Sequence, residues 1–232
     1  SVFQKRVLQS LFGTAQLGWK ESLYLDVTAR NDWSSTLAYT KHSSFFYPSV
    51  GMSAIISQMV QLPEFISYMK VRGSWASVGS AISPNIASRW RYEYNPASQS
   101  YSPVTYKFPE TFYPERTNSW EAGLTARFFD NALTLDVTFY QSNTRKQTFL
   151  RPITVGEGYS NEYVQTGNVR NRGLELSLGY NKTWGDFTWN SSLTYSMNRN
   201  KIIDLLEDPN EVISQAGLNG ANVILKKGGT MG

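Results

Sequence analysis

Hydrophobic and polar residues alternate with a period of two along much of the chain. The clearest case is LTLDVTFYQSNT at 133–144, where an apolar row runs from Leu133 to Phe139 and Asp136 belongs to the polar row. Successive side chains of a strand point to opposite faces of a sheet, so this pattern predicts a β-strand with one apolar and one polar face. The alternation recurs in about eight segments, near the length that a tilted membrane strand needs. They lie at 8–19, 23–32, 47–59, 68–78, 119–129, 133–144, 174–181 and 187–198.

The connections between these segments alternate between short and long. Short breaks fall at 20–21, near 63–64, at 130–131 and at 185–186, and long polar stretches lie at 34–46, 80–118, 145–170 and from 199 onward. An outer-membrane barrel has short periplasmic turns and long extracellular loops, whereas a soluble sandwich has no reason to gather its long loops at one end. We therefore expect the row of Leu133 to face lipid and Asp136 to face the lumen of a barrel. Residues 60–67 and 202–208 could each hold a short turn of helix.

Aromatic residues and the polar rows support the same interpretation. Tryptophans stand beside the short turns (Trp19, Trp184) and nearer the long loops (Trp33, Trp75), as expected for the two aromatic belts of a membrane barrel. The polar rows also carry charges whose burial in a packed core would cost several kcal/mol each unless they are paired. These charges are Lys70, Arg72, Arg127, Asp136 and Glu175. Alternatively, these charged residues would lie on the solvent-exposed outer face of a soluble β-sandwich.

The composition excludes several classes of protein. No apolar run approaches the roughly 18 residues of a membrane-spanning helix, so the chain is not a helical membrane protein. The chain has no cysteine, which excludes a disulfide scaffold and a thiolate metal site. Its net charge of +4 is mild and its Lys and Arg residues are scattered, so we expect no nucleic-acid partner. Because a nucleophile elbow, a P-loop and a dinucleotide fingerprint are also absent, the sequence predicts no catalytic residue, metal, cofactor or enzymatic activity.

The count of turns predicts how the chain relates to a closed barrel. The first predicted strand runs toward a short turn and the last one leaves a short turn, so both chain ends are expected on the long-loop side. Complete outer-membrane barrels normally place both termini on the periplasmic side. An open strand edge would also expose unpaired backbone groups to lipid. We therefore expect residues 1–232 to form one part of a larger barrel.

Several segments carry a family likeness, and they follow one another in a fixed order. They are RNDWSS (30–35), FYPSVGMSAIIS (46–57), MKVRGSWASVG (69–79), PERTNSWEAGLTARFFDNALTLDVTFYQSNT (114–144), TGNVRNRGLELSLGY (166–180), FTWNSSLTYSMNRNKI (187–202) and VILKKGGTMG (223–232). Together they resemble the C-terminal half of the barrel in SusC/RagA-like TonB-linked outer-membrane transporters of Bacteroidota. The likeness covers nearly the whole chain.

This resemblance implies an all-β fold and a function in uptake. Such transporters are antiparallel transmembrane barrels of about 22 strands with an N-terminal plug, so residues 1–232 would form a partial barrel without the plug domain and the final strands. They lie in the lipid of the outer membrane of Gram-negative bacteria and import oligosaccharides or peptides. They work with a SusD-like surface lipoprotein and draw energy from TonB, which would contact the missing N-terminal part. The chain alone is not expected to transport.

One segment of the longest predicted loop is a candidate for contact with substrate. The segment WRYEYNPASQSYSPVTYKF at 90–108 predicts an extra hairpin, with Trp90, Tyr92 and Tyr94 on one face and Tyr101 and Tyr106 opposite. Aromatic rings offer flat apolar faces with polar edges, which suit a sugar ring or a protein lid. The sequence therefore predicts these five side chains as substrate-binding residues, and packing of the loop on itself is the alternative.

Other classes of function stay open on the sequence alone. The first is a small self-contained outer-membrane barrel that acts as an adhesin or a structural protein. The second is a soluble carbohydrate-binding β-sandwich, which would be a monomer in water without detergent. A hydrolase is the least favoured, because the chain offers no catalytic set.

Overall fold

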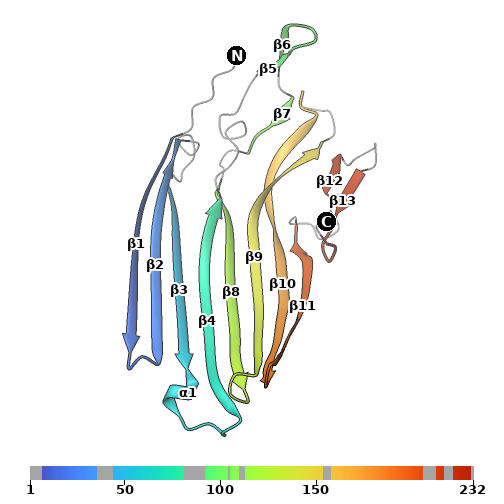
Figure 1. Cartoon of the computed structure of the whole chain (residues 1–232). Coiled ribbons are helices and arrows are strands. Elements are labelled where there is room, and N and C mark those ends of the chain that lie inside the picture. The colour runs from blue at the N-terminus through green and yellow to red at the C-terminus, as the bar shows by residue number, and fades with distance from the viewer. Residues whose placement is uncertain are drawn as a thin grey trace.

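The protein forms one curved antiparallel sheet whose long strands lie side by side in chain order (Figure 1). A computed structural model describes residues 7–35, 44–80, 92–103, 105–109, 113–153, 158–205, 213–216 and 222–230. The long strands are β1 (Leu8–Trp19), β2 (Leu23–Ser34), β3 (Ser44–Ile55), β4 (Ile66–Ser80), β8 (Glu115–Phe128), β9 (Leu133–Pro152), β10 (Asn161–Trp184) and β11 (Phe187–Asp204). The sheet is open, because within the described ranges β1 and β11 each pair with a single neighbour.

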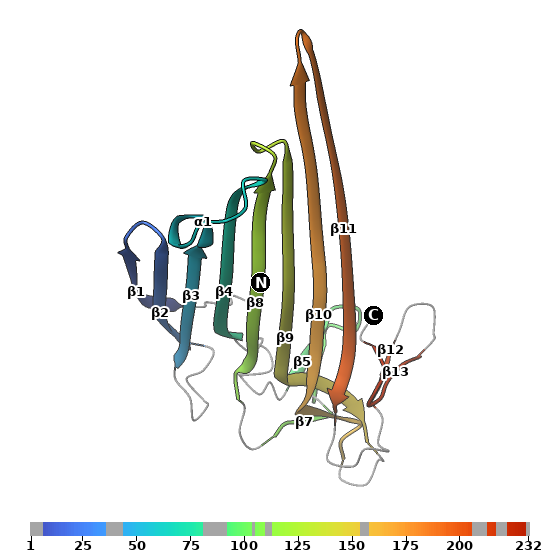
Figure 2. The same ribbon diagram turned by 90° about the horizontal axis from the view of Figure 1, so that it is seen from below.

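The short connections lie together at one end of the sheet, as the sequence predicts, and Figure 2 shows the strands from that end as one curved layer. The turn between β1 and β2 passes through Lys20 and Glu21 at φ angles of 50° and 51°, and β10 turns into β11 through Gly185 at 59°. The turn from β8 to β9 likewise passes through residues 129–131, all with positive φ. All three breaks at 20–21, 130–131 and 185–186 are therefore confirmed as tight turns.

The connection between β3 and β4 differs in detail from the prediction. Strand β3 ends at Ile55 and is followed by a single helical turn, α1 (Ile56–Met59), where the sequence predicts strand. Residues 60–65, where a helical turn was allowed, are not helical. The chain bends there because Pro63 has no amide proton to continue a helix, and the Ile66 N–H donates to the Pro63 carbonyl (2.9 Å). Within the described part of the chain, no helix is long and apolar enough to cross a membrane.

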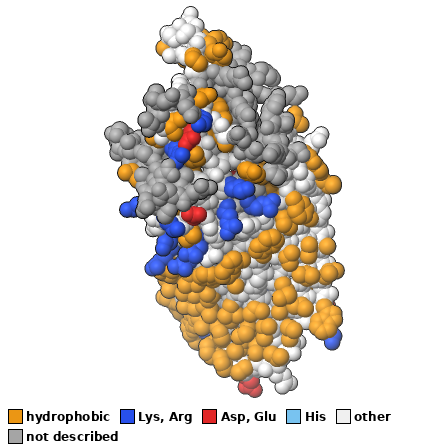
Figure 3. Space-filling view, turned by 180° about the vertical axis from the view of Figure 1, so that it is seen from behind, with side chains coloured by type: hydrophobic (Ala, Val, Ile, Leu, Met, Phe, Trp, Pro, Cys, Tyr) orange, Lys and Arg blue, Asp and Glu red, His pale blue; other side chains and the backbone are white. Residues whose placement is uncertain are grey.

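The apolar face of the sheet is its exposed face. Cross-strand pairs such as Val27–Val50 and Leu124–Val137 lie on it, and Leu193 of β11 is 62% exposed. Figure 3 shows this face as a broad, nearly uncharged apolar surface. Since large apolar areas do not remain in contact with water on a soluble domain, the face requires an apolar environment. The polar rows, with Arg72 and Asp136, line the opposite, inward face.

Strands β9 and β10 extend well beyond their predicted ends. The stretch 145–170, predicted as a long loop, is mostly strand, because β9 continues to Pro152 and β10 begins at Asn161. Strand β8 likewise begins at Glu115 and β11 continues to Asp204, so residues 202–204 are strand rather than helix. The alternation is lost in β9 and β10 because Lys146 and Gly167 lie opposite each other and both have positive φ, at 58° and 88°.

A small apolar cluster holds the long-loop end of β9 to β11 together. It consists of Phe149, Val169, Ile202, Leu205 and Leu225, with Val164 packed against it. Leu225 belongs to β13 (Asn222–Leu225), which pairs with β12 (Ile213–Ala216) in a separate two-stranded sheet. Backbone hydrogen bonds of 2.8 Å join Ile202 to Gly228 and Gly229. The cluster therefore fixes this hairpin to the top of the large sheet.

Candidate functional site

The centre of the inward face carries a charged network built around Arg72 of β4. Its guanidinium donates to both carboxylate oxygens of Asp136 on β9, at 3.0 and 3.3 Å. It also donates to the hydroxyls of Thr125 on β8 (3.0 Å) and Thr138 on β9 (2.6 Å). The Thr125 hydroxyl donates in turn to Asp136 (2.6 Å). This bidentate arrangement is the geometry in which Arg binds a carboxylate most specifically.

Arg72 reaches Asp136 only because a glycine stands between them. Gly123 of β8 is the cross-strand partner of Arg72, and Asp136 lies one strand further on. A Cβ on Gly123 would lie 2.6 Å from Arg72 Cζ, so the guanidinium occupies the space that a larger side chain would fill. The sequence places Arg72 and Asp136 in inward rows, but it does not predict that they pair across β8.

The network lies on a solvent-exposed surface of the sheet and not in a buried centre. The side chains of Arg72, Asp136 and Glu121 are 31%, 37% and 45% exposed, and Glu121 Oε1 lies 3.7 Å from Arg72 Nε. An adjoining hollow of about 240 Å³ is lined mostly by hydroxyl and carboxylate side chains, from Asp136 to Glu175 and Ser196. Such a surface can hydrogen-bond to polar solutes, and the described residues offer no group of three or more metal-ligating side chains.

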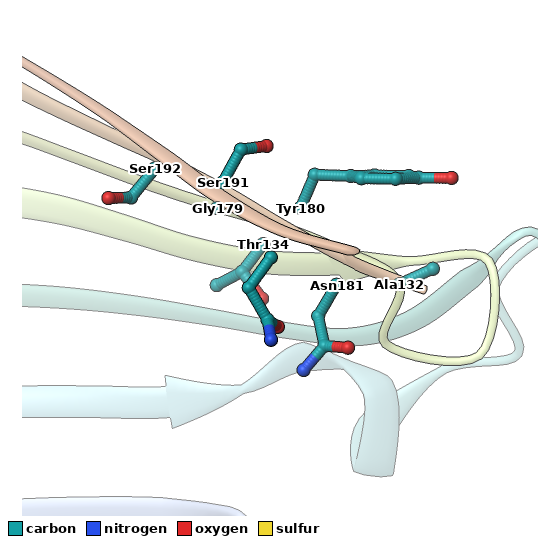
Figure 4. A pocket seen from close by; sticks show the side chains of 8 residues that line it. Ala132, Thr134, Gly179, Tyr180, Asn181, Ser191 and Ser192 are labelled. Atoms are coloured by element: carbon teal, nitrogen blue, oxygen red, sulfur yellow. The ribbon is translucent and has the colours of Figure 1, made fainter. Parts of the chain in front are cut away.

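A second hollow of about 300 Å³ lies near the short-turn end of β9, β10 and β11 (Figure 4). Thr134 and Asn181 lie on one side of the strands, and Tyr180 and Ser191 lie on the other. The residues that line it include no carboxylate, Lys or His. It therefore provides hydroxyl and amide groups for hydrogen bonds.

Three of the five predicted aromatic residues lie in one hairpin. Strand β5 (Tyr92–Asn95) pairs with β6 (Ser100–Pro103), and Tyr94 lies directly opposite Tyr101 with ring centroids 5.1 Å apart. Tyr92, Tyr94 and Tyr101 are 62%, 45% and 72% exposed, which leaves their faces open to a ligand. Trp90 lies outside the described residues. The structure thus contains the predicted hairpin, over 92–103 rather than 90–108.

Tyr106 does not join this hairpin, which corrects its predicted placement. It lies in β7 (Tyr106–Lys107), which pairs in parallel with the start of β10. There its ring packs edge-on against Tyr163 at 5.8 Å, and Phe108 stacks on the same ring at 5.4 Å. The backbone N–H of Ser160 donates to the Thr105 carbonyl (2.9 Å), which draws this segment toward β10.

The extension of β9 and β10 carries polar contacts that the sequence did not reveal. Arg151 of β9 pairs with Glu162 of β10, and both side chains are at most one-quarter exposed. The Lys146 ammonium lies 3.8 Å from the centroid of the Tyr113 ring, and the Gln165 side chain donates to the Tyr113 carbonyl (2.7 Å). These contacts hold the upper parts of β9 and β10 together above the membrane-spanning part of the sheet, and they join Tyr113 to it.

These features define the wall of a transmembrane β-barrel: an apolar outward face, a polar inward face, and short turns at one end only. Residues 3–222 match the family described as TonB dependent receptor-like, beta-barrel, and the chain belongs to this family. The family consists of outer-membrane proteins of Gram-negative bacteria. The assignment decides against the soluble β-sandwich that the sequence left open.

Individual relatives agree with the assignment. The chain is 27% identical to TonB-dependent receptor P3 of Formosa agariphila over 100% of this chain and 24% of that protein. It is 25% identical to TonB-dependent receptor SusC of Bacteroides thetaiotaomicron over 87% of this chain and 21% of that protein. The chain therefore spans about a quarter or less of the length of these curated relatives.

A solved structure shows the same fold. The structure of the RagAB peptide importer in the 'open-open' state matches 96% of this chain and 24% of its own chain, with a TM-score of 0.77 and 23% identity. The matched part includes nearly the entire curved sheet. The expectation of a SusC/RagA-like barrel is thereby confirmed at the level of family and fold.

Proposed function

We propose that the chain is part of the barrel of an outer-membrane TonB-dependent importer of large nutrients, namely oligosaccharides or peptides. The observation that carries this proposal is the family match over residues 3–222. Similarity to SusC and to the RagAB peptide importer supports uptake of large solutes over a purely structural role. In this proposal residues 1–232 are one section of the barrel wall, and the plug and the other strands belong to the rest of the protein.

The inward face suits this role. A nutrient that passes along the lumen meets hydroxyls, amides and the Arg72 network, which hydrogen-bond to polar solutes without a strong net charge. A barrel of the proposed size has a lumen filled by a plug. The polar wall then also provides the surface against which the plug packs. We propose that TonB acts through the plug side and that a SusD-like surface lipoprotein covers the long-loop side.

The aromatic hairpin is the part of the chain that we assign to substrate or lid contact. The exposed rings of Tyr92, Tyr94 and Tyr101 stand at the long-loop end, where an incoming solute arrives first (Figure 1). Rings of this kind pack flat on sugar rings and on apolar side chains alike. In this proposal Tyr106 supports the wall through Tyr163, and Trp90 remains a substrate-binding prediction.

The test uses the full-length protein in its own bacterium. Deletion of the gene should abolish uptake of either fluorescein-labelled oligosaccharides or fluorescein-labelled peptides, and dissipation of the proton gradient should have the same effect. Replacing both Tyr94 and Tyr101 with Ala should lower the uptake rate about tenfold, the size expected for loss of a stacked ring.

The control is a variant with Ser100→Ala and Ser102→Ala, which changes the opposite face of the same hairpin. Outer-membrane abundance is measured for every strain, so that loss of protein is not mistaken for loss of uptake. Wild-type uptake in the tyrosine variant would overturn the role of the hairpin. Unchanged uptake of both labelled solutes after gene deletion would overturn the importer itself.

A further inference from the structure

The outward face of β8 to β11 carries a cluster of six cations at the upper margin of the apolar surface. The cluster consists of Arg116, Arg145, Arg170, Arg172, Arg199 and Lys201. All six side chains belong to the outward face. Each lies an even number of residues from Trp120, Phe139, Leu174 or Met197 on its own strand, toward the long-loop end, and residues at even spacing share a face. Figure 3 shows Lys and Arg side chains gathered just above the apolar surface.

The register places these cations directly opposite one another. Arg116 pairs with Arg145, Arg172 with Arg199, and Arg170 with Lys201. Like charges directly opposite on a sheet destabilise it, so three such pairs side by side oppose the fold unless an anion lies between them. The outward positions among them hold Asn118, Gln141, Asn143 and Asn168.

Within the described ranges one carboxylate, that of Asp204 opposite Asn168, lies at the upper edge of the cluster, and it forms no ion pair with the six cations. The ion pairs found there involve Arg30, Arg72 and Arg151 but none of the six cations. Arg116 makes one long hydrogen bond, to the Phe46 carbonyl at 3.5 Å. The Nε atom of Arg170 is buried and has no hydrogen-bond partner among the described atoms. The cluster therefore keeps unpaired positive charge that an external anion can bind.

The position of the cluster identifies that anion. Trp120 and Phe139, whose rings lie 5.3 Å apart, mark the upper margin of the apolar surface. Arg116 stands two outward positions beyond Trp120 on β8, and Arg172 stands one outward position beyond Leu174, the cross-strand partner of Phe139. Each outward position adds about 7 Å along the strand, which places both residues at the depth of lipid headgroups. At the same level β2 and β3 place Asn31 and Phe46 outward, a pair without charge. Among the described strands, the cations at this level thus lie in one sector of the wall.

We infer that this cluster binds the phosphates of a phosphorylated glycolipid of the lipid A class in the outer leaflet. Arginine pairs bidentately with phosphate, and several arginines in register match a headgroup with more than one phosphate. The acyl chains of the same lipid lie along the apolar surface directly below. This inference rests on the proposed orientation, with the long loops outside the cell.

The experiment measures lipid binding by the purified full-length protein in detergent, using native mass spectrometry with added diphosphoryl lipid A. The wild type should retain the lipid, and the variant Arg172→Gln with Arg199→Gln should bind it about tenfold more weakly. The matched control is Lys20→Gln with Lys182→Gln, which removes the same charge at the short-turn end and should bind like the wild type. Heat-modifiable mobility on gels verifies that all three proteins are folded.

Further ligands separate the sources of phosphate. Dephosphorylated lipid A should bind about as weakly to the wild type as diphosphoryl lipid A binds to the arginine variant. Equal binding of phosphatidylglycerol, or full competition by millimolar inorganic phosphate, would overturn the assignment to this lipid class. Equal loss in the control variant would overturn the site. Because the assay needs no uptake, its failure leaves the importer proposal to be judged separately.

Discussion

At the scale of single residues, two inward-facing glycines determine which side chains can cross the strands. Gly123 leaves room for the Arg72 guanidinium, and Gly173 of β10 leaves room for the ring of Tyr140, its partner on β9. A Cβ on Gly173 would collide with that ring and would also lie 2.6 Å from the Met197 carbonyl oxygen. The backbone of β11 cannot yield as a side chain can, so the position accepts glycine alone.

Replacing Gly173 with Ala should therefore destabilise the folded barrel by about 1–3 kcal/mol, the usual cost of overpacking. The urea midpoint of the full-length protein folded in lipid vesicles measures this loss. Gly179→Ala is the matched control, because Gly179 lies on the same face of the same strand and its nearest neighbour would be 3.9 Å away. Equal midpoints for the two variants would contradict the proposed collision.

At this scale the sequence predicts which face of the sheet a side chain lies on, but it does not predict which side chains pair across the strands. The alternation correctly predicts that Arg72 and Asp136 face inward. Their pairing depends on the register of three strands and on the missing side chain at Gly123, and neither is visible in the alternation itself. Tyr106 was misplaced for a related reason, because its parallel pairing with Asn161 joins segments far apart in the chain.

At the scale of elements, the upper halves of β9 and β10 behave as a separate unit. The paired positive φ angles at Lys146 and Gly167 break the alternation, and the apolar cluster around Ile202 then joins this part to β11 and β13. Alternation of polar and apolar residues indicates a strand with one face in water and one face in an apolar environment. In the upper halves of β9 and β10, both faces carry polar groups or packed side chains. That is why the sequence assigned 145–170 to a loop.

The apolar cluster makes a prediction about this unit. Ile202 is 0% exposed, so Ile202→Ala should cost about 2–5 kcal/mol of local stability and release β13 from the sheet. Trypsin added to intact cells should then cut at Lys226 or Lys227 faster than in the wild type, as followed by mass spectrometry. Ile224→Ala, at a side chain that is 61% exposed, is the control and should leave the cleavage rate unchanged. Equal cleavage of both variants would show that the cluster does not hold the hairpin.

At the scale of the whole molecule, no described residue forms a second layer on the apolar face of the sheet, and this decides how the protein meets its surroundings. The sequence predicted the two faces correctly, because a period of two survives wherever one face meets lipid and the other meets water. It could not predict the curvature or the sector of cations on β8 to β11. Both depend on how separate strands align.

Adjacent residues on β10 provide a test of the two faces. Leu176→Lys places a charge on the apolar face and should lower the stability of the inserted barrel by about 2–4 kcal/mol. Ser177→Lys places the same charge on the inward face opposite Asp136 and should be tolerated. The fraction of full-length protein that reaches the folded, heat-modifiable form in the outer membrane measures both. If the Leu176→Lys variant folded like the wild type and the Ser177→Lys variant did not, the assignment of the two faces would be reversed.

The pairing of β4 with β8 has a consequence for how such proteins diversify. These strands pair from Ser80 and Glu115 down to the short-turn end, although the chain between them makes an excursion that contains β5, β6 and β7. Their alignment is secured by the wall and does not depend on what the excursion contains. Because β5 and β6 pair with each other in a separate sheet, this hairpin is an exchangeable cassette: one barrel wall can display different outer surfaces without any change in its membrane-spanning strands.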